Sequence, residues 1–447
     1  MIIDPSIFKA YDIRGVYPLQ LNEKIAYLVG RSFATFLKPK KVIVGRDMRL
    51  SGPVLKKNLI KGLTDQGVDV VDVGMVSTDS YYFVCTKLGI PGIMVTASHN
   101  PKEFNGFKMV RKMPYLLSGD EGIQDIRKLV EKGKYSRVAK KGRIEKCDYT
   151  DQFIKKVLSF IDPGEIVSLK VIADTANGMV GPFLTKLYKN LPVELKLIYG
   201  KPDGNLPNHG LDPLMPENRV KIEKLVVAEK ADLGFMFDGD GDRFFVIDDR
   251  GKFVSGDFLT ALLGKYLLEK HPRSKIIYDI RASWVVPDLI EENGGTSLFE
   301  RVGHAFIKRR MADENALFAG EITGHYYHRD FNYSDSGLIS SLLVLEMLSR
   351  KKVKMSDLLK PLEKKYFISG EINSKVADPA AKIRQLTKKY KDGRQNMLDG
   401  ITVFYKDWHF NVRPSNTEAL LRLNLEAVSK ELMEQKRDEM LSIIRSS

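Results

Sequence analysis

The segment that decides the fold runs from Lys41 to Val76 and reads KVIVGRDMRLSGPVLKKNLIKGLTDQGVDVVDVGMV. Its opening run, Lys41 to Gly45, is rich in the β-branched side chains that favour a strand. Ser51 can cap a helix that extends to Gln66, and the glycine that follows can end it. Residues 68–76 then alternate as a strand does. This order predicts a βαβ unit with parallel strands.

The same alternation restarts twice further along the chain. After the Lys- and Gly-rich stretch 131–146 we expect a helix over 148–161 and a strand over 169–173. A later helix over 258–270 precedes a strand over 275–279. Because 447 residues are too many for one core, three modules of about 100 to 150 residues match the usual size of a domain.

The last part of the chain has a different order. From Phe367 it predicts a strand, a helix over 380–390, further strands and a helix over 426–444. We therefore expect an α/β protein with three similar α/β domains, whose sheets are mainly parallel, and a smaller C-terminal α+β domain. The predicted domains are residues 1–146, 147–249, 250–364 and 365–447.

A hydroxyl-bearing loop follows a short buried strand. Residues 92–95 are apolar, and the loop from Thr96 to Pro101 reads TASHNP. A serine exposed at a strand end, such as Ser98, can accept a phosphoryl or acyl group. A plain loop serine is the more ordinary interpretation, and Thr96 is a second hydroxyl in the same loop.

A second loop, residues 238–243, reads DGDGDR and lies between the apolar runs 233–237 and 244–247. Its three carboxylates repel one another unless a cation lies among them, and hard oxygen ligands favour Mg²⁺ or Ca²⁺. An EF-hand does not fit, because the chain re-enters a strand at once and no glutamate stands at the twelfth loop position. A solvated acidic turn is the alternative. We predict a metal site at Asp238, Asp240 and Asp242.

Together these loops resemble those of the α-D-phosphohexomutase superfamily, in its phosphomannomutase/phosphoglucomutase branch. Three other segments are similar to that branch and occur in its order: Lys9–Gly15 (KAYDIRG), Gly320–His325 (GEITGH) and Arg413–Glu418 (RPSNTE). The resemblance therefore spans essentially the whole chain. It implies three similar α/β domains and a fourth, smaller one, arranged around a central cleft.

The resemblance also implies roles for particular residues. Ser98 would carry the phosphoryl group and, with the three aspartates, hold one Mg²⁺ per chain. The other candidate catalytic residues are Lys108, Arg14, His304 and His99. A lysine with positive neighbours can lose its proton near neutrality, which would suit Lys108 for general acid/base chemistry. The candidate substrate-binding residues are Tyr11, Arg243, Arg281, Glu321, Thr323, His325, Arg413, Ser415, Asn416 and Thr417.

The implied reaction interconverts hexose 1-phosphate and hexose 6-phosphate, of mannose and/or glucose, with glucose 1,6-bisphosphate as activator. A phosphoserine enzyme and a hexose 1,6-bisphosphate would be its intermediates. A phosphoglucosamine mutase is the alternative within this chemistry, but it typically has Gln in place of Ile322 and Ser-Gly-Thr in place of residues 415–417. Thr323 and Arg281 stand where the branch more often has serine and lysine, and arginine keeps the charge of lysine but not its geometry.

Two other classes of protein remain as alternatives. A metal-dependent phosphatase of the haloacid dehalogenase type also has alternating aspartates after a strand, but uses the first of them as nucleophile. The third alternative is a non-enzymatic sugar-phosphate or nucleic-acid binder. The net charge of +14 is spread over scattered lysines with no long basic run, so we expect a small-molecule sugar phosphate as partner and no nucleic acid.

Composition points to a globular protein, with 43% hydrophobic and 29% charged residues. No stretch reaches the roughly 18 apolar residues that span a bilayer, and the N-terminus lacks the pattern of a signal peptide. Cys85 and Cys147 do not make a disulfide framework. We therefore expect a cytoplasmic protein with no membrane partner, either a monomer or a weak homodimer.

Overall fold

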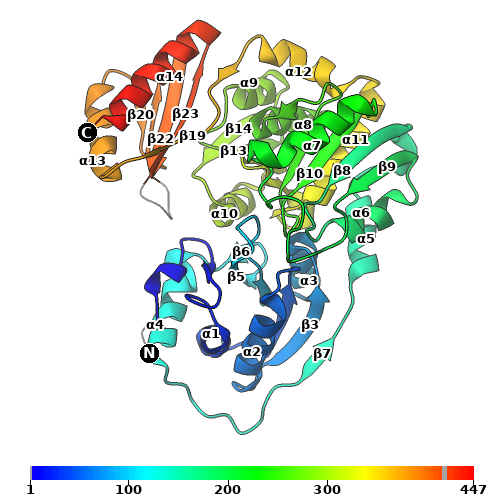
Figure 1. The fold of residues 1–447 in the computed structure, drawn as a ribbon, viewed down its shortest axis with the longest axis vertical. Helices are drawn as coiled ribbons and strands as arrows, with labels where there is room; N and C mark the ends of the chain where they lie inside the picture. The colour runs from blue at the N-terminus through cyan, green and yellow to red at the C-terminus, as the bar shows by residue number, and fades with distance from the viewer. Residues whose placement is uncertain (1–2, 415–419, 447) are drawn as a thin grey trace. The chain divides into compact units, whose positions relative to one another are not determined.

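The computed structural model describes residues 3–414 and 420–446 (Figure 1). The chain divides into two compact units. Unit 1 contains Met1–Val254 and Thr323–Lys354, and unit 2 contains Ser255–Ile322 and Met355–Ser447. Within the described residues, no helix combines the length and the apolar character that crossing a bilayer requires.

The first sheet of unit 1 has the strand order β1-β5-β4-β2-β3-β7, with β6 beside β5. Strands β2, β3, β4 and β7 pair in parallel, whereas β5 is antiparallel to its neighbours. The strands are β1 (Ile13–Val16), β2 (Lys41–Arg46), β3 (Asp69–Met75), β4 (Gly92–Val95), β5 (Phe104–Lys112), β6 (Tyr115–Leu116) and β7 (Ile144–Lys146). The α-helices are α1 (Glu23–Leu37), α2 (Gly52–Thr64), α3 (Thr78–Leu88) and α4 (Gln124–Lys132), with short helices at Pro5–Ile7 and Gly119–Ile123.

The second sheet of unit 1 has the order β12-β11-β10-β8-β9, and only β8, β9 and β10 are parallel. Its strands are β8 (Leu169–Asp174), β9 (Val193–Ile198), β10 (Leu233–Phe237), β11 (Phe244–Ile247) and β12 (Phe253–Val254). The helices of this region are α5 (Thr150–Leu158), α6 (Gly181–Tyr188) and α7 (Pro216–Ala228), with a short helix at Pro163–Glu165. Unit 1 also holds β16 (Tyr326–His328), β17 (Ser334–Asp335), α11 (Gly337–Lys351) and a short helix at Arg329–Phe331.

Unit 2 combines a parallel set of strands with an antiparallel sheet. The parallel strands have the order β14-β13-β15, and the antiparallel sheet has the order β18-β23-β22-β21-β20 with β19 beside β23. The strands are β13 (Lys275–Asp279), β14 (Thr296–Glu300), β15 (Phe318–Gly320), β18 (Phe367–Ile368), β19 (Ile372–Lys375), β20 (Arg394–Asn396), β21 (Ile401–Phe404), β22 (Trp408–Pro414) and β23 (Leu420–Ala427). The helices are α8 (Gly256–Lys270), α9 (Val285–Glu292), α10 (His304–Glu314), α12 (Met355–Glu363), α13 (Pro379–Lys389) and α14 (Lys430–Arg445).

The predicted fold class is confirmed, with one refinement. Each α/β sheet is mixed rather than mainly parallel, because hairpin strands such as β5 and β11 add antiparallel pairs to a parallel centre. The predicted βαβ unit is present as β2, α2 and β3. Ser51 stands at the N-cap of α2 but makes no side-chain cap; its hydroxyl instead accepts a 2.8 Å hydrogen bond from Asn105.

The predicted helix over 426–444 begins too early. Residues up to Ala427 belong to β23, and α14 begins at Lys430, where the Ser429 side chain accepts a hydrogen bond from the Leu432 N–H. Glu426 resembles a first-turn helix acid in the sequence, but it is a buried strand residue. It accepts hydrogen bonds from Ser283 and from the Trp284 N–H and contacts His409, partners that only the folded chain supplies.

The helices that cover the first sheet pack closely at two glycines. A Cβ on Gly30 of α1 would lie 2.3 Å from the Leu59 carbonyl oxygen, and one on Gly62 of α2 would lie 2.1 Å from the Tyr27 carbonyl oxygen. This layer buries β2 and β4, as Val44 and Val95 in the same core illustrate. Both strands end at one edge of the sheet, since β2 and β4 are parallel, and that edge carries the candidate site.

Candidate active site and metal centre

Ser98 lies in the loop that follows β4, and its side chain meets the predicted metal loop. The Ser98 hydroxyl donates a 2.6 Å hydrogen bond to an Asp238 carboxylate oxygen, and the residue is only 1% exposed. The His99 ring Nδ1 lies 3.4 Å from the same hydroxyl. The structure thus brings together two loops that the sequence separates by 140 positions.

The metal loop connects β10 to β11, as expected. Asp238, Asp240 and Asp242 are each at most 1% exposed, and one ligand oxygen from each lies within 4.8 Å of the others. The Gly241 and Arg243 N–H groups donate to the second Asp238 oxygen at 3.1 and 3.2 Å, and the positive φ of Gly241 (81°) permits this turn. Three buried carboxylates from one tight loop form the donor set that a hard divalent cation prefers.

Two oxygens of this triad support the fit to a cation. The Oδ1 atoms of Asp240 and Asp242 are buried and have no hydrogen-bond partner among the described residues. A buried charged oxygen without a partner is costly, so such atoms in a native site call for an ion or an ordered water. The residues present therefore fit a divalent cation.

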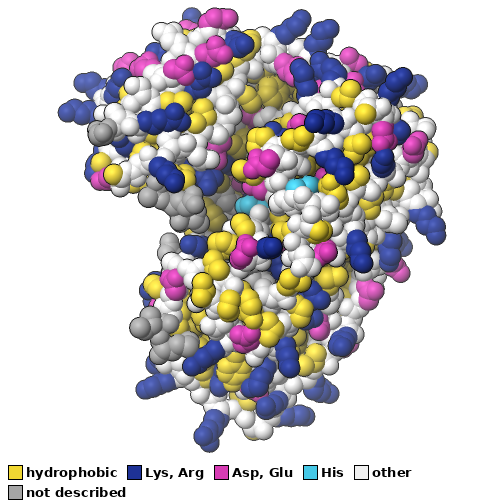
Figure 2. Space-filling model, viewed as in Figure 1, with side chains coloured by type: hydrophobic (Ala, Val, Ile, Leu, Met, Phe, Trp, Pro, Cys, Tyr) yellow, Lys and Arg dark blue, Asp and Glu magenta, His cyan; other side chains and the backbone are white. Residues whose placement is uncertain are grey.

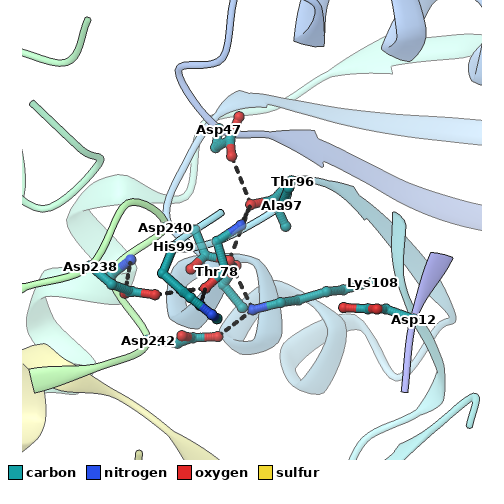
Figure 3. Close-up of polar contacts among 12 residues, drawn as sticks. Asp12, Asp47, Thr78, Thr96, Ala97, His99, Lys108, Asp238, Asp240 and Asp242 are labelled. Carbon is teal, nitrogen blue, oxygen red and sulfur yellow. Dashed lines mark hydrogen bonds and ion pairs between the residues drawn. The ribbon is translucent and has the colours of Figure 1, made fainter. Parts of the chain in front are cut away.

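Lys108 on β5 contacts the same triad from the first sheet (Figure 3). Its ammonium group donates to Asp240 at 2.8 Å and also to Asp242. Burial by itself would lower the pKa of Lys108, but the two carboxylates outweigh it and raise that pKa above its usual value. The expectation that positive neighbours would let Lys108 lose its proton near neutrality is wrong in this arrangement, because its nearest charged groups are carboxylates.

Asp238 and Asp240 have pKa values shifted in opposite directions. Burial, reinforced by the charges of Asp240 and Asp242, raises the pKa of Asp238 well above its usual value. Burial would raise the pKa of Asp240 too, but the Lys108 ammonium outweighs it and lowers that pKa. One lysine thus balances part of the negative charge of the triad, and Asp238 accepts the hydrogen bond from the Ser98 hydroxyl.

Helix α3 also points its first turn at the metal loop. The Thr78 hydroxyl donates to the Asp240 carboxylate at 2.6 Å, and the Thr78 N–H donates to the Asp240 carbonyl at 2.8 Å. The positive end of the helix dipole therefore faces the carboxylates, which favours their charged form.

Arg14 and His99 lie at the serine loop, the loop from Thr96 to Pro101 that contains Ser98. Arg14 sits opposite Gly106 in the β1–β5 pair; it donates to Asp12 at 2.7 Å and also to Asn100 of the loop. Burial, followed by the positive charge of Arg243, holds the pKa of His99 well below its usual value. His99 is therefore neutral at physiological pH and acts as a hydrogen-bonding group beside Ser98.

Arg243, at the end of the metal loop, contacts His325, the last residue of the segment Gly320–His325 that resembles the family. Its Nε donates to the His325 Nε2 at 3.0 Å, and the His325 Nδ1 lies 2.8 Å from an Asp335 oxygen. Arg243 Nε also lies 4.0 Å from Asp238. Within unit 1 the structure thus assembles Ser98, His99, Lys108, Arg14, the three aspartates, Arg243 and His325.

Unit 2 contains four of the described candidates: Arg281, His304, Glu321 and Arg413. Arg281 is buried and donates to both oxygens of Asp279, at 2.9 and 3.0 Å, and to Glu371 at 3.0 Å. Glu321 lies 3.9 Å from the Arg281 guanidinium. Burial would lower the pKa of Arg281, but Asp279 and Glu371 outweigh it and raise that pKa. The Arg281 guanidinium thus donates hydrogen bonds to carboxylates of the protein itself, an arrangement the sequence did not predict.

The other candidates are placed as follows. His304 is the first residue of α10, Arg413 lies near the end of β22 with its guanidinium 3.8 Å from Asp399, and Tyr11 is half-buried just before β1. Thr323 follows β15 at the start of the second segment of unit 1. The candidate substrate-binding residues Ser415, Asn416 and Thr417 lie outside the described residues.

Sequence reasoning missed several residues of the site. Asp47 and Arg49 contact the serine loop from the end of β2, and Thr78 contacts the metal loop from α3. A signal was available for the first two. They are polar residues directly after a buried strand that runs parallel to the strand before Ser98, so both strand ends had to meet at one edge.

Models of phosphoglucomutase/phosphomannomutase domains match this chain in four consecutive segments. The α/β/α domains I, II and III match residues 5–137, 148–251 and 255–366, and the C-terminal domain matches residues 371–443.

Similar proteins extend over nearly the whole chain. The phosphomannomutases of Salmonella typhimurium and Escherichia coli K12 are each 41% identical to it over 448 residues, which covers 98% of both chains compared. A solved phosphoglucomutase/phosphomannomutase family protein from Burkholderia thailandensis is 34% identical, with a TM-score of 0.89 over 99% of this chain and 98% of its own. The resemblance carried by five short segments is confirmed: the chain belongs to the phosphoglucomutase/phosphomannomutase family of hexose-phosphate mutases, which are isomerases.

Proposed function

We propose that this mutase interconverts the 1- and 6-phosphates of mannose and glucose, using Ser98 as the phosphoryl carrier. The observation that carries the proposal is the 2.6 Å contact between the Ser98 hydroxyl and Asp238 of the buried triad. A hydroxyl held beside a cation-binding set of carboxylates suits metal-assisted phosphoryl transfer.

The reaction would proceed in two half-steps, each a transfer of a phosphoryl group between Ser98 and the sugar. In the first, a sugar hydroxyl attacks the phosphorus on phosphorylated Ser98; the bond between phosphorus and Ser98 Oγ breaks, and its electron pair stays on Oγ. A sugar bisphosphate results. After the bisphosphate turns around, Ser98 Oγ attacks the other phosphate, and the oxygen of the sugar leaves with the electron pair. The enzyme is thereby phosphorylated again.

In each half-step a proton must leave the attacking hydroxyl and a proton must reach the leaving oxygen, which is Ser98 Oγ in the first half-step and the sugar oxygen in the second. Lys108, Arg14 and His304 remain the candidates for this transfer. Lys108 and Arg14 are both cationic and lie at the serine and metal loops, so in this form they could give a proton to the leaving oxygen but not accept one from the attacking hydroxyl. Their charge also opposes the negative charge of the transferring group, which is the main electrostatic demand of phosphoryl transfer.

Asp238, Asp240 and Asp242, together with phosphorylated Ser98, would hold one Mg²⁺. The support is their burial and the Oδ1 atoms of Asp240 and Asp242, which have no hydrogen-bond partner among the described residues. When bound, Mg²⁺ would neutralise charge on the phosphoryl oxygens. Glucose 1,6-bisphosphate would act as activator, because any loss of the bisphosphate intermediate leaves Ser98 without its phosphoryl group.

The remaining residues would recognise the substrate. Arg243 suits the transferring phosphate, since it ends the metal loop and its backbone N–H contacts Asp238. Glu321 can accept hydrogen bonds from sugar hydroxyls, with Thr323 and His325 adding polar contacts. The other proposed substrate-binding residues are Tyr11, Arg281, Arg413, Ser415, Asn416 and Thr417.

The proposal extends to partners and location. Lys and Arg side chains are spread over the face seen in Figure 2 and alternate with Asp and Glu, which suits attraction of a small anion better than binding of nucleic acid. Neither Cys85 nor Cys147 forms a disulfide within the described residues, in keeping with a cytoplasmic protein. A monomer or weak homodimer is the oligomeric state we propose.

A direct test compares mannose 1-phosphate, glucose 1-phosphate and glucosamine 1-phosphate with the purified protein, Mg²⁺ and a trace of glucose 1,6-bisphosphate. We expect turnover of the first two and a phosphate on the peptide that contains Ser98, detected by mass spectrometry. Preference for the amino sugar would instead indicate a phosphoglucosamine mutase. Ser98→Ala should abolish isomerisation, whereas release of inorganic phosphate that survives this change would indicate a phosphatase with an aspartate nucleophile.

A further inference from the structure

Ser98 has a backbone conformation that residues with a side chain rarely adopt. Its φ is 50°, in the left-handed region that favours glycine. A residue stays in such a conformation only where its surroundings hold it there. The question is therefore which groups hold the two peptide groups on either side of the Ser98 side chain.

The N–H group of Ser98 is held by the threonine two positions earlier. Ser98 N–H donates to the Thr96 hydroxyl at 2.9 Å. That hydroxyl lies 2.7 Å from an Asp47 carboxylate oxygen and 3.2 Å from an Asp240 oxygen. A hydroxyl has one proton, so the shorter contact indicates that Thr96 donates its proton in a hydrogen bond to Asp47. A lone pair of the Thr96 oxygen then accepts the hydrogen bond from the Ser98 N–H. Figure 3 shows this link from Thr96 to Asp47.

The carbonyl group of Ser98 is held by a buried arginine. Arg49 Nη2 donates to the Ser98 carbonyl oxygen at 2.8 Å and to the Asn100 carbonyl oxygen at 2.6 Å. Its Nη1 donates to the carbonyl oxygens of Pro101 and Phe104 at 2.6 and 2.9 Å. The Arg49 side chain is only 1% exposed, so one guanidinium holds the whole loop from the interior.

Asp47 connects the two halves of this arrangement. Besides contacting Thr96, its carboxylate lies 3.2 Å from Arg49 Nε and accepts the Arg49 N–H at 3.0 Å. Asp47 is fully buried, and the charge of Arg49 is the nearby charge that compensates it. The carboxylate thus fixes the guanidinium on one side and the Thr96 hydroxyl on the other.

Gly239 lets the metal loop approach the backbone of Ser98 closely. A Cβ on Gly239 would lie 2.7 Å from the Ser98 carbonyl oxygen, so only a glycine allows the loop to approach the serine so closely. The orientation of Ser98 and its distance from Asp238 therefore depend on the same few contacts.

We propose that Arg49, Asp47 and Thr96 are positioning residues that hold Ser98 in its left-handed conformation, with its hydroxyl aimed at the metal centre. The inference rests on the proposed role of Ser98 as phosphoryl carrier. None of the three side chains needs to touch the sugar. Their loss should therefore slow phosphoryl transfer while leaving the binding of the sugar phosphate unchanged.

The decisive comparison is Thr96→Val with Thr96→Ser. Valine keeps the shape of threonine but removes the hydroxyl, so the Ser98 N–H and Asp47 both lose a partner. We expect Thr96→Val to lower kcat for glucose 1-phosphate by about 10- to 100-fold, with KM within twofold of the wild-type value. Thr96→Ser keeps the hydroxyl and should retain kcat within about threefold.

Arg49→Lys tests the contacts that hold the Ser98 carbonyl group. A lysine offers three donors from a single point and cannot reach four carbonyl oxygens in two directions, so we expect a loss of kcat at least as large as for Thr96→Val. Matched controls are Thr64→Val and Arg31→Lys. The Thr64 hydroxyl donates to the carbonyls of Ile60 and Lys61 in α2, and the Arg31 guanidinium stacks on Tyr135. Both controls should keep wild-type kcat.

Two further measurements separate positioning from general damage. Mass spectrometry after mixing with glucose 1,6-bisphosphate should show slower phosphorylation of Ser98 in Thr96→Val than in Thr64→Val. The thermal unfolding midpoints of the two variants should be equal. A crystal structure of Thr96→Val should show φ of Ser98 outside the left-handed region. If Arg49→Lys does not fold, the Thr96 series alone decides.

Wild-type kcat in Thr96→Val, or an unchanged φ at Ser98 in its crystal structure, would overturn the inference. So would a loss of kcat in Thr96→Val no larger than in Thr64→Val. Failure of the proposed function would look different: the wild-type protein itself would show neither phosphoserine at Ser98 nor isomerisation. In that case the crystal structure of Thr96→Val still tests how the loop is held.

Discussion

The Lys108 ammonium donates a 2.8 Å hydrogen bond to the Asp240 carboxylate, which lies 132 positions later in the chain. Both side chains are buried, so this contact ties β5 of the first sheet to the metal loop of the second. The same ammonium also contacts Asp242. The charge balance of the metal centre therefore depends on a residue from another domain-sized module.

Replacing Lys108 should lower both the stability of the folded protein and the rate of the reaction. In Lys108→Met the carboxylates lose their buried counter-charge, and removing one partner of such a pair costs about 3 kcal/mol. We expect a decrease of that size in the free energy of unfolding without metal, measured with urea, and a loss of kcat of about 10²- to 10³-fold. Lys56→Met, which removes the Lys56–Asp72 pair at 2.6 Å, should lower stability but keep turnover. Equal turnover in the two variants would contradict this role for Lys108.

Binding of Mg²⁺ should depend on the triad. Because a cation that binds only the folded state stabilises it, we expect the thermal midpoint to rise with Mg²⁺ concentration and to fall with a chelator. Asp242→Asn should weaken Mg²⁺ binding at least about tenfold in isothermal titration calorimetry, since it removes one charge from three. Asp151→Asn, which alters an exposed carboxylate, should bind Mg²⁺ like the wild type. An unchanged affinity in Asp242→Asn would place the cation elsewhere.

Asp79 should make stability depend on pH. Burial raises the pKa of Asp79 to about 7, although Ser336, Ser77 and the Ser80 N–H all donate to its carboxylate. Since the folded state holds this proton more tightly than the unfolded state does, the contribution is fully present below the unfolded pKa of 3.8. It is lost as pH rises towards 7, and the total change is at most roughly 4 kcal/mol.

The comparison with Asp79→Asn isolates that contribution. The amide has nearly the same shape and does not titrate, so the difference in unfolding free energy between the two proteins should change between pH 4 and 7 and be constant above pH 8. Urea unfolding at a series of pH values, with a chelator present, measures it. A difference that is independent of pH would show that Asp79 has an ordinary pKa.

Arg281 should matter more for the stability of unit 2 than a surface arginine does. Arg281→Lys loses the paired hydrogen bonds to Asp279 and the contact with Glu371, so we expect unfolding to become easier by about 2 kcal/mol. Arg437→Lys alters an exposed pair with Asp438 and should change stability by less than about 0.5 kcal/mol. Urea unfolding of both variants is the measurement. A loss in Arg281→Lys as small as in Arg437→Lys would mean that lysine satisfies the same carboxylates.

The family and the fold class could be predicted because their signals are local. Strand and helix periods mark most elements to within a few residues, as β13 and the strands on either side of the metal loop illustrate. The helix start at Glu426 was misplaced since an acid before a helical pattern looks like a first-turn residue. Only its contacts with Ser283 and His409 reveal a buried strand position.

The candidate site could be predicted only in part. Residue types and spacing pointed to the aspartate triad, and the family resemblance selected Ser98 over Thr96, but the pKa of Lys108 was misjudged. That pKa depends on which charges lie within a few ångströms, and those charges belong to a different sheet. The partners of Arg281 could not be predicted for a similar reason, because the sequence does not show that its guanidinium donates to Asp279 and Glu371.

By itself, then, the sequence determined the order of strands and helices, the two loops that carry chemistry and the family to which they belong. These depend on hydrophobic period, glycine positions and side-chain type, which are properties of neighbouring residues. Only the tertiary structure decided the conformation of Ser98, the partners of Lys108 and the burial of Arg49. Such features arise where parallel strands end at a common edge, and side chains distant in the chain must there satisfy one another's charges and hydrogen bonds without water.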